Sequence, residues 1–201
     1  MTNEELKLAL EELYTKPQFD IIQKGQVVFY GSSSFRLWDD LKKTLNHDDI
    51  VNLAFGGSTL KVCADKFEEI VTPFRPRSIV IYAGDNDIGN GVLENELFSS
   101  FIRLTNKIRF EFGEIPIFFL SIKPSIQRSD NLPTIRAFNL MVQNHIQNIN
   151  NCQFIDIHHA MLLENGKVNP ALFEDDGLHM NAKGYAIWGE ILRAYSNQIF
   201  N

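Results

Sequence analysis

Five short runs of apolar, β-branched and aromatic residues recur along the chain, and they predict β-strands. Their residues are nearly continuous in hydrophobicity rather than alternating with polar ones, which is typical of strands covered on both faces. The sequence therefore predicts a sheet buried between two other layers. The runs are Gln26–Tyr30, Ile50–Phe55, Ser78–Ala83, Ile115–Ser121 and Gln153–Ile157.

Between and after these runs, apolar residues recur at intervals of three and four, as they do along one face of a helix. A helix over Glu4–Tyr14 precedes the first run, with Thr2 and Glu5 spaced as a capping box. We expect Ser58 to cap the helix after the second run, and Gly113 to end the helix after the third. The apolar faces are Trp38, Leu41 and Leu45; Leu60, Cys63, Phe67, Ile70 and Val71; Leu93, Leu97, Phe101, Leu104 and Ile108; Phe138, Met141, Val142 and Ile149; and, from about Asn181, Tyr185, Ile187, Trp188, Ile191 and Leu192.

The alternation of strands and helices predicts an α/β fold with a parallel sheet between two helical layers. Two hundred and one residues are enough for one domain. We expect residues 1–201 to form it, with residues 1–20 as an N-terminal helical extension packed on it. In such folds ligands bind beyond the carboxyl ends of the strands, so functional residues are expected directly after each strand.

Composition excludes several classes of protein. A hydrophobic fraction of 44% and a charged fraction of 22% are ordinary for a globular domain and exclude disordered, collagen-like and coiled-coil chains. The formal charge of −6 and the lack of a basic run argue against a nucleic-acid partner. Cys63 and Cys152 are too few for a disulfide framework or a zinc motif. An acidic N-terminus and the lack of a long apolar stretch predict a cytoplasmic protein without a signal peptide or membrane span.

The first strand is followed by Gly31-Ser32-Ser33-Ser34 and then a helical pattern. Neither of the glycine-rich nucleotide-binding motifs is present. A strand, turn and helix in this order can expose a serine hydroxyl at the edge of the sheet, beside backbone N–H groups that the helix leaves free. Taken alone, however, the segment is better explained as a serine-rich helix cap.

The other strand ends carry further polar groups. Asn52 to Thr59 contains the pair Gly56-Gly57, and the third strand runs into Gly84-Asp85-Asn86-Asp87. Late in the chain, Asp176 precedes His179 by three residues, a spacing that lets a carboxylate orient the imidazole. Each segment alone is explained by turn or capping chemistry. Together they supply a hydroxyl nucleophile, a base with its orienting acid, and hydrogen-bond donors, which are the groups that acyl transfer requires.

The ordered set resembles the four sequence blocks of the SGNH (GDSL-type) hydrolases. The blocks here are Gly31-Ser32-Ser33 followed by Phe-Arg-Leu-Trp, Asn52 to Thr59, Gly84 to Asp87, and Asp176 with His179, within a match from Val27 to Trp188. The resemblance implies a flavodoxin-like α/β/α fold with a five-stranded parallel sheet. It also implies ester hydrolysis without a metal or another cofactor.

The resemblance further implies individual roles. It matches Ser33 to the nucleophile, and His179 with Asp176 to the base and its orienting acid. It matches the oxyanion hole to Ser33, Gly57 and Asn86.

Two positions depart from the family pattern. Ser32 stands where aspartate is common, as in a Gly-Ser-Ser-Ser subgroup, and Ala54 stands where glycine is frequent. We expect Lys123 to Arg128 to be a surface loop without a catalytic role. The pair His158-His159 is expected to point in opposite directions into solvent, and not to bind a metal.

The expected activity is hydrolysis of small carboxylic esters, through an acyl-enzyme on Ser33. Short loops and the lack of a lid-sized insertion favour short acyl groups, such as acetyl. The alternatives are a binding module that retains the hydrolase frame, and a flavodoxin-like nucleotide or flavin binder that rests on analogy of fold alone. The sequence gives no indication of the oligomeric state.

Overall fold

The computed structural model describes residues 2–201, so Met1, the first residue of the predicted domain, lies outside the described residues. Within them the strands form one five-stranded parallel sheet in the order β2-β1-β3-β4-β5. The prediction of a parallel α/β sheet is confirmed, although most predicted runs extend beyond the hydrogen-bonded strands. The strands are β1 (Val27–Gly31), β2 (Ile50–Asn52), β3 (Ser78–Tyr82), β4 (Ile117–Leu120) and β5 (Cys152–Ile155).

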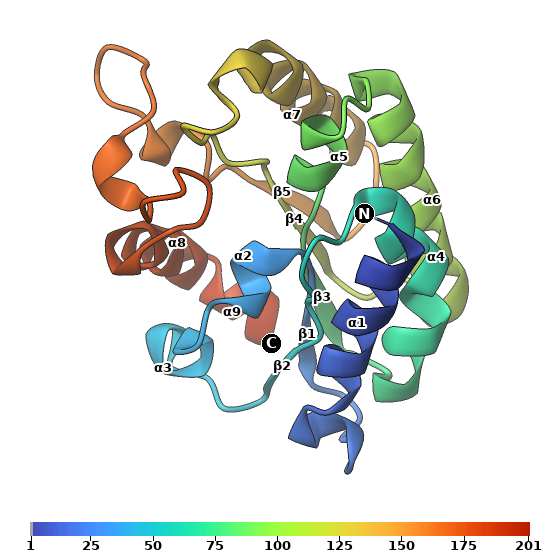
Figure 1. The fold of residues 1–201 in the computed structure, drawn as a ribbon. Helices are drawn as coiled ribbons and strands as arrows, with labels where there is room; N and C mark the ends of the chain where they lie inside the picture. Colours follow the sequence, from blue (N-terminus) through green and yellow to red (C-terminus); the bar gives the residue numbers. More distant parts are fainter. Residues whose placement is uncertain (1) are drawn as a thin grey trace.

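Helices cover both faces of the sheet, as Figure 1 shows. The helices are α1 (Asn3–Tyr14), α2 (Ser33–Arg36), α3 (Leu41–Leu45), α4 (Leu60–Ile70), α5 (Asp85–Gly89), α6 (Glu94–Phe112), α7 (Leu132–Ile146), α8 (Ala182–Ala194) and α9 (Ser196–Phe200). Short 3₁₀ helices lie at Pro17–Phe19, Thr72–Phe74, Ser129–Asn131, His159–Met161 and Pro170–Leu172. Within residues 2–201, no helix has the length and apolarity needed to cross a membrane.

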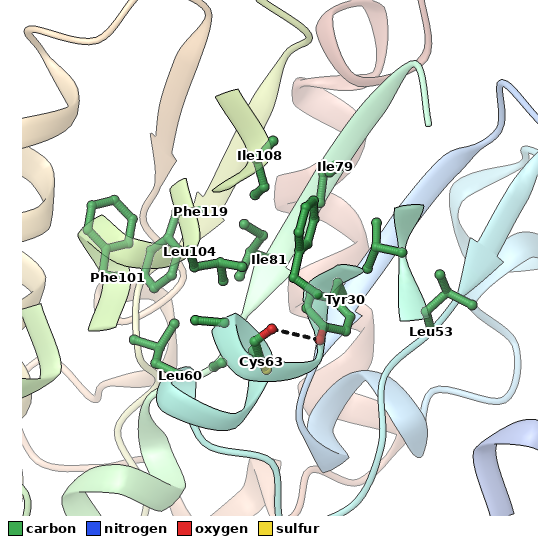
Figure 2. Packing of buried hydrophobic residues seen from close by; sticks show 14 of the residues in the cluster. Tyr30, Leu53, Leu60, Cys63, Ile79, Ile81, Phe101, Leu104, Ile108 and Phe119 are labelled. Atoms are coloured by element: carbon green, nitrogen blue, oxygen red, sulfur yellow. Dashed lines mark hydrogen bonds between the residues drawn. The ribbon is translucent and has the colours of Figure 1, made fainter. Parts of the chain in front are cut away.

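Two hydrophobic cores lie on opposite faces of the sheet, because successive strand residues point to opposite faces. In β1, Val28 and Tyr30 join the core formed with α1, α4, α6 and α7, whereas Val27 and Phe29 join the core formed with α3, α8 and α9. Figure 2 shows part of the first core, where the Tyr30 hydroxyl donates a hydrogen bond of 2.9 Å to the Cys63 carbonyl. Cys63 is therefore a packing residue, as its position on an apolar helix face predicts.

The helix ends follow the predicted signals with one exception. Thr2 and Glu5 form the capping box of α1, and Gly113 follows the last residue of α6. The prediction for α4 is wrong by one residue: Thr59 caps it, accepting a hydrogen bond of 3.1 Å from the Val62 N–H, while Ser58 is buried before the helix. The chain after β1 also turns twice, so that the single helix expected there is divided into α2 and α3.

One connection is longer than expected. Residues 156–181 link β5 to α8 through two short 3₁₀ helices and little other regular structure, and they form the orange segment in Figure 1. The expectation of short loops after every strand is therefore wrong at β5. This segment carries Asp176 and His179.

Candidate active site

The turn after β1 places Ser33 at the carboxyl edge of the sheet. Gly31 ends the strand with a φ of 141°, and a Cβ atom there would lie 1.9 Å from the Tyr82 carbonyl oxygen of the neighbouring strand. Only glycine allows that approach. The next residue, Ser32, donates its N–H to the same carbonyl at 2.9 Å. Ser33 is then the first residue of α2 and remains half-buried at the surface.

The long segment before α8 brings His179 and Asp176 to this serine. His179 Nε2 lies 3.1 Å from Ser33 Oγ, and His179 Nδ1 lies 2.6 Å from Asp176 Oδ2. The other carboxylate oxygen, Oδ1, accepts hydrogen bonds from the N–H groups of Leu178 at 2.8 Å and of His179 at 2.9 Å. A hydroxyl, an imidazole and a carboxylate in this order can move a proton from the hydroxyl to the imidazole.

The surroundings of Asp176 keep its carboxyl group ionised. Partial burial raises the pKa, but the hydrogen bond from the Leu178 N–H, together with those from the ring and N–H of His179, outweighs this effect. The net result is a pKa of about 2. At neutral pH the carboxylate is therefore charged and able to stabilise an imidazolium on His179.

One hydrogen bond joins α8 to the serine turn, one caps α8, and one joins the histidine segment to the loop after β4. The Tyr185 hydroxyl on α8 donates to the Ser34 carbonyl at 3.0 Å. The Asn181 side chain caps α8, accepting from the Lys183 N–H at 2.9 Å. The Gln127 N–H donates to the Gly177 carbonyl at 3.0 Å. The position of His179 relative to Ser33 thus depends on Tyr185, Asn181 and Gln127. The sequence of the Asp176–His179 segment alone does not reveal these contacts.

Asn86 and the Gly57–Ser58 turn lie together, and Arg36 of α2 lines the same groove. Asn86 Nδ2 donates a hydrogen bond of 3.0 Å to the Ser58 carbonyl. Since an amide NH₂ carries two donors, this bond holds the side chain while leaving the second N–H available. Gly57 and Asn86 line the same groove. Gly84, with a φ of 117°, starts the turn into α5 that carries Asn86.

A comparison with protein-family models matches residues 23–187 to the GDSL-like Lipase/Acylhydrolase family. This chain belongs to that family. It is accordingly a carboxylic ester hydrolase by class. A comparison of this chain with curated proteins found no match.

Solved structures of several proteins share the fold of this GDSL-like chain. A protein from Streptococcus pneumonia superposes with a TM-score of 0.83 at 20% identity, over 96% of this chain and 95% of that one. A GDSL-like lipase from Bacteroides thetaiotaomicron gives 0.77 at 20% identity, over 96% and 97%. An acetyl-xylooligosaccharide esterase from Geobacillus gives 0.68 at 15% identity, over 89% and 95%. At these identities the likeness establishes the α/β/α fold.

A buried ion pair supports the helix that carries Asn86. Lys123 Nζ lies 2.7 Å from Asp85 Oδ2, and the two side chains are only 1% and 7% exposed. Arg128 Nε lies 3.6 Å from the other oxygen of Asp85. The expectation of a surface loop is therefore wrong for its first part, because Lys123, Pro124 and Ser125 are buried. The sequence around Lys123 contains no signal for this pairing, because Lys123 follows β4 whereas Asp85 follows β3.

Asn52 is a second supporting residue whose role was not predicted. Its side-chain NH₂ donates to the Phe35 carbonyl at 2.7 Å, and its side-chain oxygen accepts from the Ala54 N–H at 3.1 Å. Asn52 thereby joins the end of β2 to the serine-bearing helix α2. The Asn52 side chain thus links the first and second sequence blocks of the family, and it positions the helix that carries Ser33.

The two adjacent histidines after β5 lie in different environments. His158 is buried, with Nδ1 3.0 Å from the Ile122 carbonyl, whereas His159 is exposed. The expectation of two solvated histidines is thus wrong for His158. His159 is not isolated either, because its Nδ1 lies 2.5 Å from Asp156 Oδ2. The prediction that the two side chains point in opposite directions is also wrong, because their rings lie edge to face with centroids 5.6 Å apart.

The buried carboxyl of Asp87 gives a testable pH dependence. Burial raises its pKa from 3.8 to about 6, against the lowering effect of the hydrogen bond that it accepts from the Leu60 N–H at 2.9 Å. A raised pKa in the folded state means that stability is lost as pH rises from about 4 to 6. We expect Asp87→Asn to remove this loss, so that its stability relative to wild type rises by about 2–3 kcal/mol from pH 4 to pH 7. Urea unfolding at each pH measures this; parallel profiles for the two proteins contradict the prediction.

Breaking the Lys123–Asp85 pair should be costly. Removing one partner leaves an uncompensated buried charge, so Lys123→Met is expected to lose about 3–5 kcal/mol of unfolding free energy. Lys61→Met is the matched control, because Lys61 pairs with Asp65 at 2.9 Å on the exposed surface of α4. The control should lose less than about 1 kcal/mol. Denaturant unfolding compares them, and equal losses would show that the buried pair contributes no more than the exposed one.

Proposed function

We propose that this GDSL-like protein hydrolyses short-chain carboxylic esters through an acyl-enzyme on Ser33. The observation that carries the proposal is the distance of 3.1 Å between Ser33 Oγ and His179 Nε2, with Asp176 on the far side of the imidazole. Family membership supports ester hydrolysis in general.

In the first half of the reaction, His179 takes the Ser33 proton as Oγ attacks the acyl carbon. The carbonyl oxygen becomes an oxyanion, which the N–H groups of Ser33 and Gly57 and the second amide N–H of Asn86 stabilise. The C–O bond to the alcohol then breaks. The alcohol oxygen leaves with the proton from His179.

In the second half, water takes the place of the alcohol. His179 removes a proton from water, whose oxygen attacks the acyl carbon of the Ser33 ester. Collapse of this second tetrahedral intermediate releases the carboxylic acid and returns the proton to Ser33. Throughout, the ionised Asp176 stabilises the imidazolium.

The preference for short acyl groups is supported by a structural neighbour. The Geobacillus protein with the same fold is an acetyl-xylooligosaccharide esterase, which acts on an ester of a two-carbon acid. A groove of about 520 Å³ beside Gly57 and Asn86 offers a place for a small acyl group.

Removing the Ser33 hydroxyl tests the nucleophile. We expect Ser33→Ala to lower kcat for p-nitrophenyl acetate by more than about 10⁴-fold, because no other group can form the acyl-enzyme. Ser99→Ala, on the exposed face of α6, is the surface control. A fluorophosphonate probe should label wild type at Ser33, as read by peptide mass spectrometry. Full activity in Ser33→Ala would exclude the assignment, and absence of both labelling and turnover in wild type would favour the non-catalytic binding module.

The Asn86 side chain can be tested separately. Loss of one preorganised oxyanion donor typically costs about 10²–10³ in kcat, and we expect this reduction for Asn86→Ala with p-nitrophenyl acetate. Because Asn86 also bonds the Ser58 carbonyl, unfolding in urea is measured in parallel. A variant with an unchanged kcat would remove Asn86 from the oxyanion hole.

A further inference from the structure

One face of the N-terminal helix α1 lines the groove that contains Gly57 and Asn86. The α1 residues there are Glu5, Leu8, Ala9 and Glu12. Their spacing of three, four and seven residues from the first places them on one side of a helix. This face of α1 is therefore a wall of the groove beside the proposed oxyanion hole.

The adjoining side of α1 fixes the wall in place. Leu10 and Leu13 are buried in the core that α1 shares with the sheet. At the end of the helix, the Tyr14 ring packs edge-on against Phe19 at a centroid distance of 5.0 Å, and its hydroxyl donates to Glu69 at 2.5 Å. Ala9 also packs against this core, whereas the Leu8 side chain stays exposed.

The charged residues of the wall already have partners. The Glu5 carboxylate accepts the Thr2 N–H of the capping box at 2.7 Å, and Glu12 pairs with Arg36 at 3.1 Å. The apolar part of the wall is Ala9 with Leu8, whose side chain is 56% exposed. Arg36 and Asn90 also line the groove, so Leu8 and Ala9 form its apolar patch, against which an uncharged aliphatic group can pack.

A second groove, of about 740 Å³, lies on the histidine side. It contains His179 and is lined by Leu37, Met180 and Tyr185 as well as by the charged side chains of Asp39, Lys43, Glu174 and Arg193. Because His179 gives its proton to the leaving oxygen, the alcohol portion of the ester departs on the side of this groove. The acyl portion is then left for the groove that holds the oxyanion donors and α1.

From these observations we infer that the α1 wall is the acyl-binding subsite and that Leu8 determines acyl specificity. The inference rests on the proposed function. The ligand of this subsite is a short, uncharged aliphatic acyl group, whose methylene groups contact Leu8 and Ala9 after the carbonyl enters the oxyanion hole.

The test compares acyl-length profiles of Leu8 variants with p-nitrophenyl acetate, butyrate and hexanoate. Leu8→Trp fills the groove and should lower the butyrate-to-acetate ratio of kcat/KM by about tenfold. Leu8→Ala enlarges it and should raise the hexanoate-to-acetate ratio. Leu140→Ala on α7 is the matched control, since its side chain is 57% exposed and lies outside the groove. Ratios that match the control in both Leu8 variants overturn the inference.

A second measurement separates the acyl side from the alcohol side. Hydrolysis of a preformed butyryl-enzyme depends only on the acyl group, because the alcohol has already left. Leu8→Trp should therefore slow this step in single-turnover experiments, and the same slowing should appear whichever alcohol delivered the butyryl group. If Leu8→Trp instead changes kcat/KM differently for ethyl acetate and hexyl acetate, the alcohol portion contacts α1. That result would overturn the inference. If the wild-type protein shows neither turnover nor labelling of Ser33, the proposed ester hydrolysis itself is refuted. If the wild type is active but the Leu8 variants match the control, only the acyl-subsite inference is refuted.

Discussion

The close contact between β1 and β3 is the constraint on which the candidate site depends. These neighbouring central strands end side by side, and the absence of a side chain at Gly31 lets the two backbones meet at the Tyr82 carbonyl. Ser32 completes that contact with its N–H, so the chain must turn at once into α2. The same strand end leads through Gly84 into α5. The turns that carry Ser33 and Asn86 thus follow two neighbouring strands.

At this edge of the sheet, three successive side chains of α5 make different contacts. Asp85 is neutralised by the buried Lys123, Asn86 faces the groove, and Asp87 is held by the Leu60 N–H. Burying two carboxyl groups beside an amide is expensive, and the raised pKa of Asp87 is a direct sign of that cost. The arrangement fixes a short helix whose own length gives it little stability.

The two Asp-x-x-His segments show why local sequence is insufficient. Asp156 with His159 and Asp176 with His179 have the same spacing, the same contact between Nδ1 and a carboxylate oxygen, and the same backbone bonds to the other oxygen. No local feature separates them. Of these two histidines, only His179 has a serine hydroxyl opposite its Nε2, and the Tyr185 hydroxyl joins the helix that follows it to the turn after β1.

By itself the sequence determined the order of strands and helices, the parallel three-layer arrangement and the segments in which reactive residues stand. Hydrophobic periodicity and turn chemistry act over a few residues, so a single chain displays them directly. Only the tertiary structure decided that Lys123 is buried against Asp85, that Asn52 bonds the Phe35 carbonyl, and that α1 walls the groove beside Gly57. These are contacts between segments distant in the chain. Their energies depend on burial and distance, which no local pattern encodes.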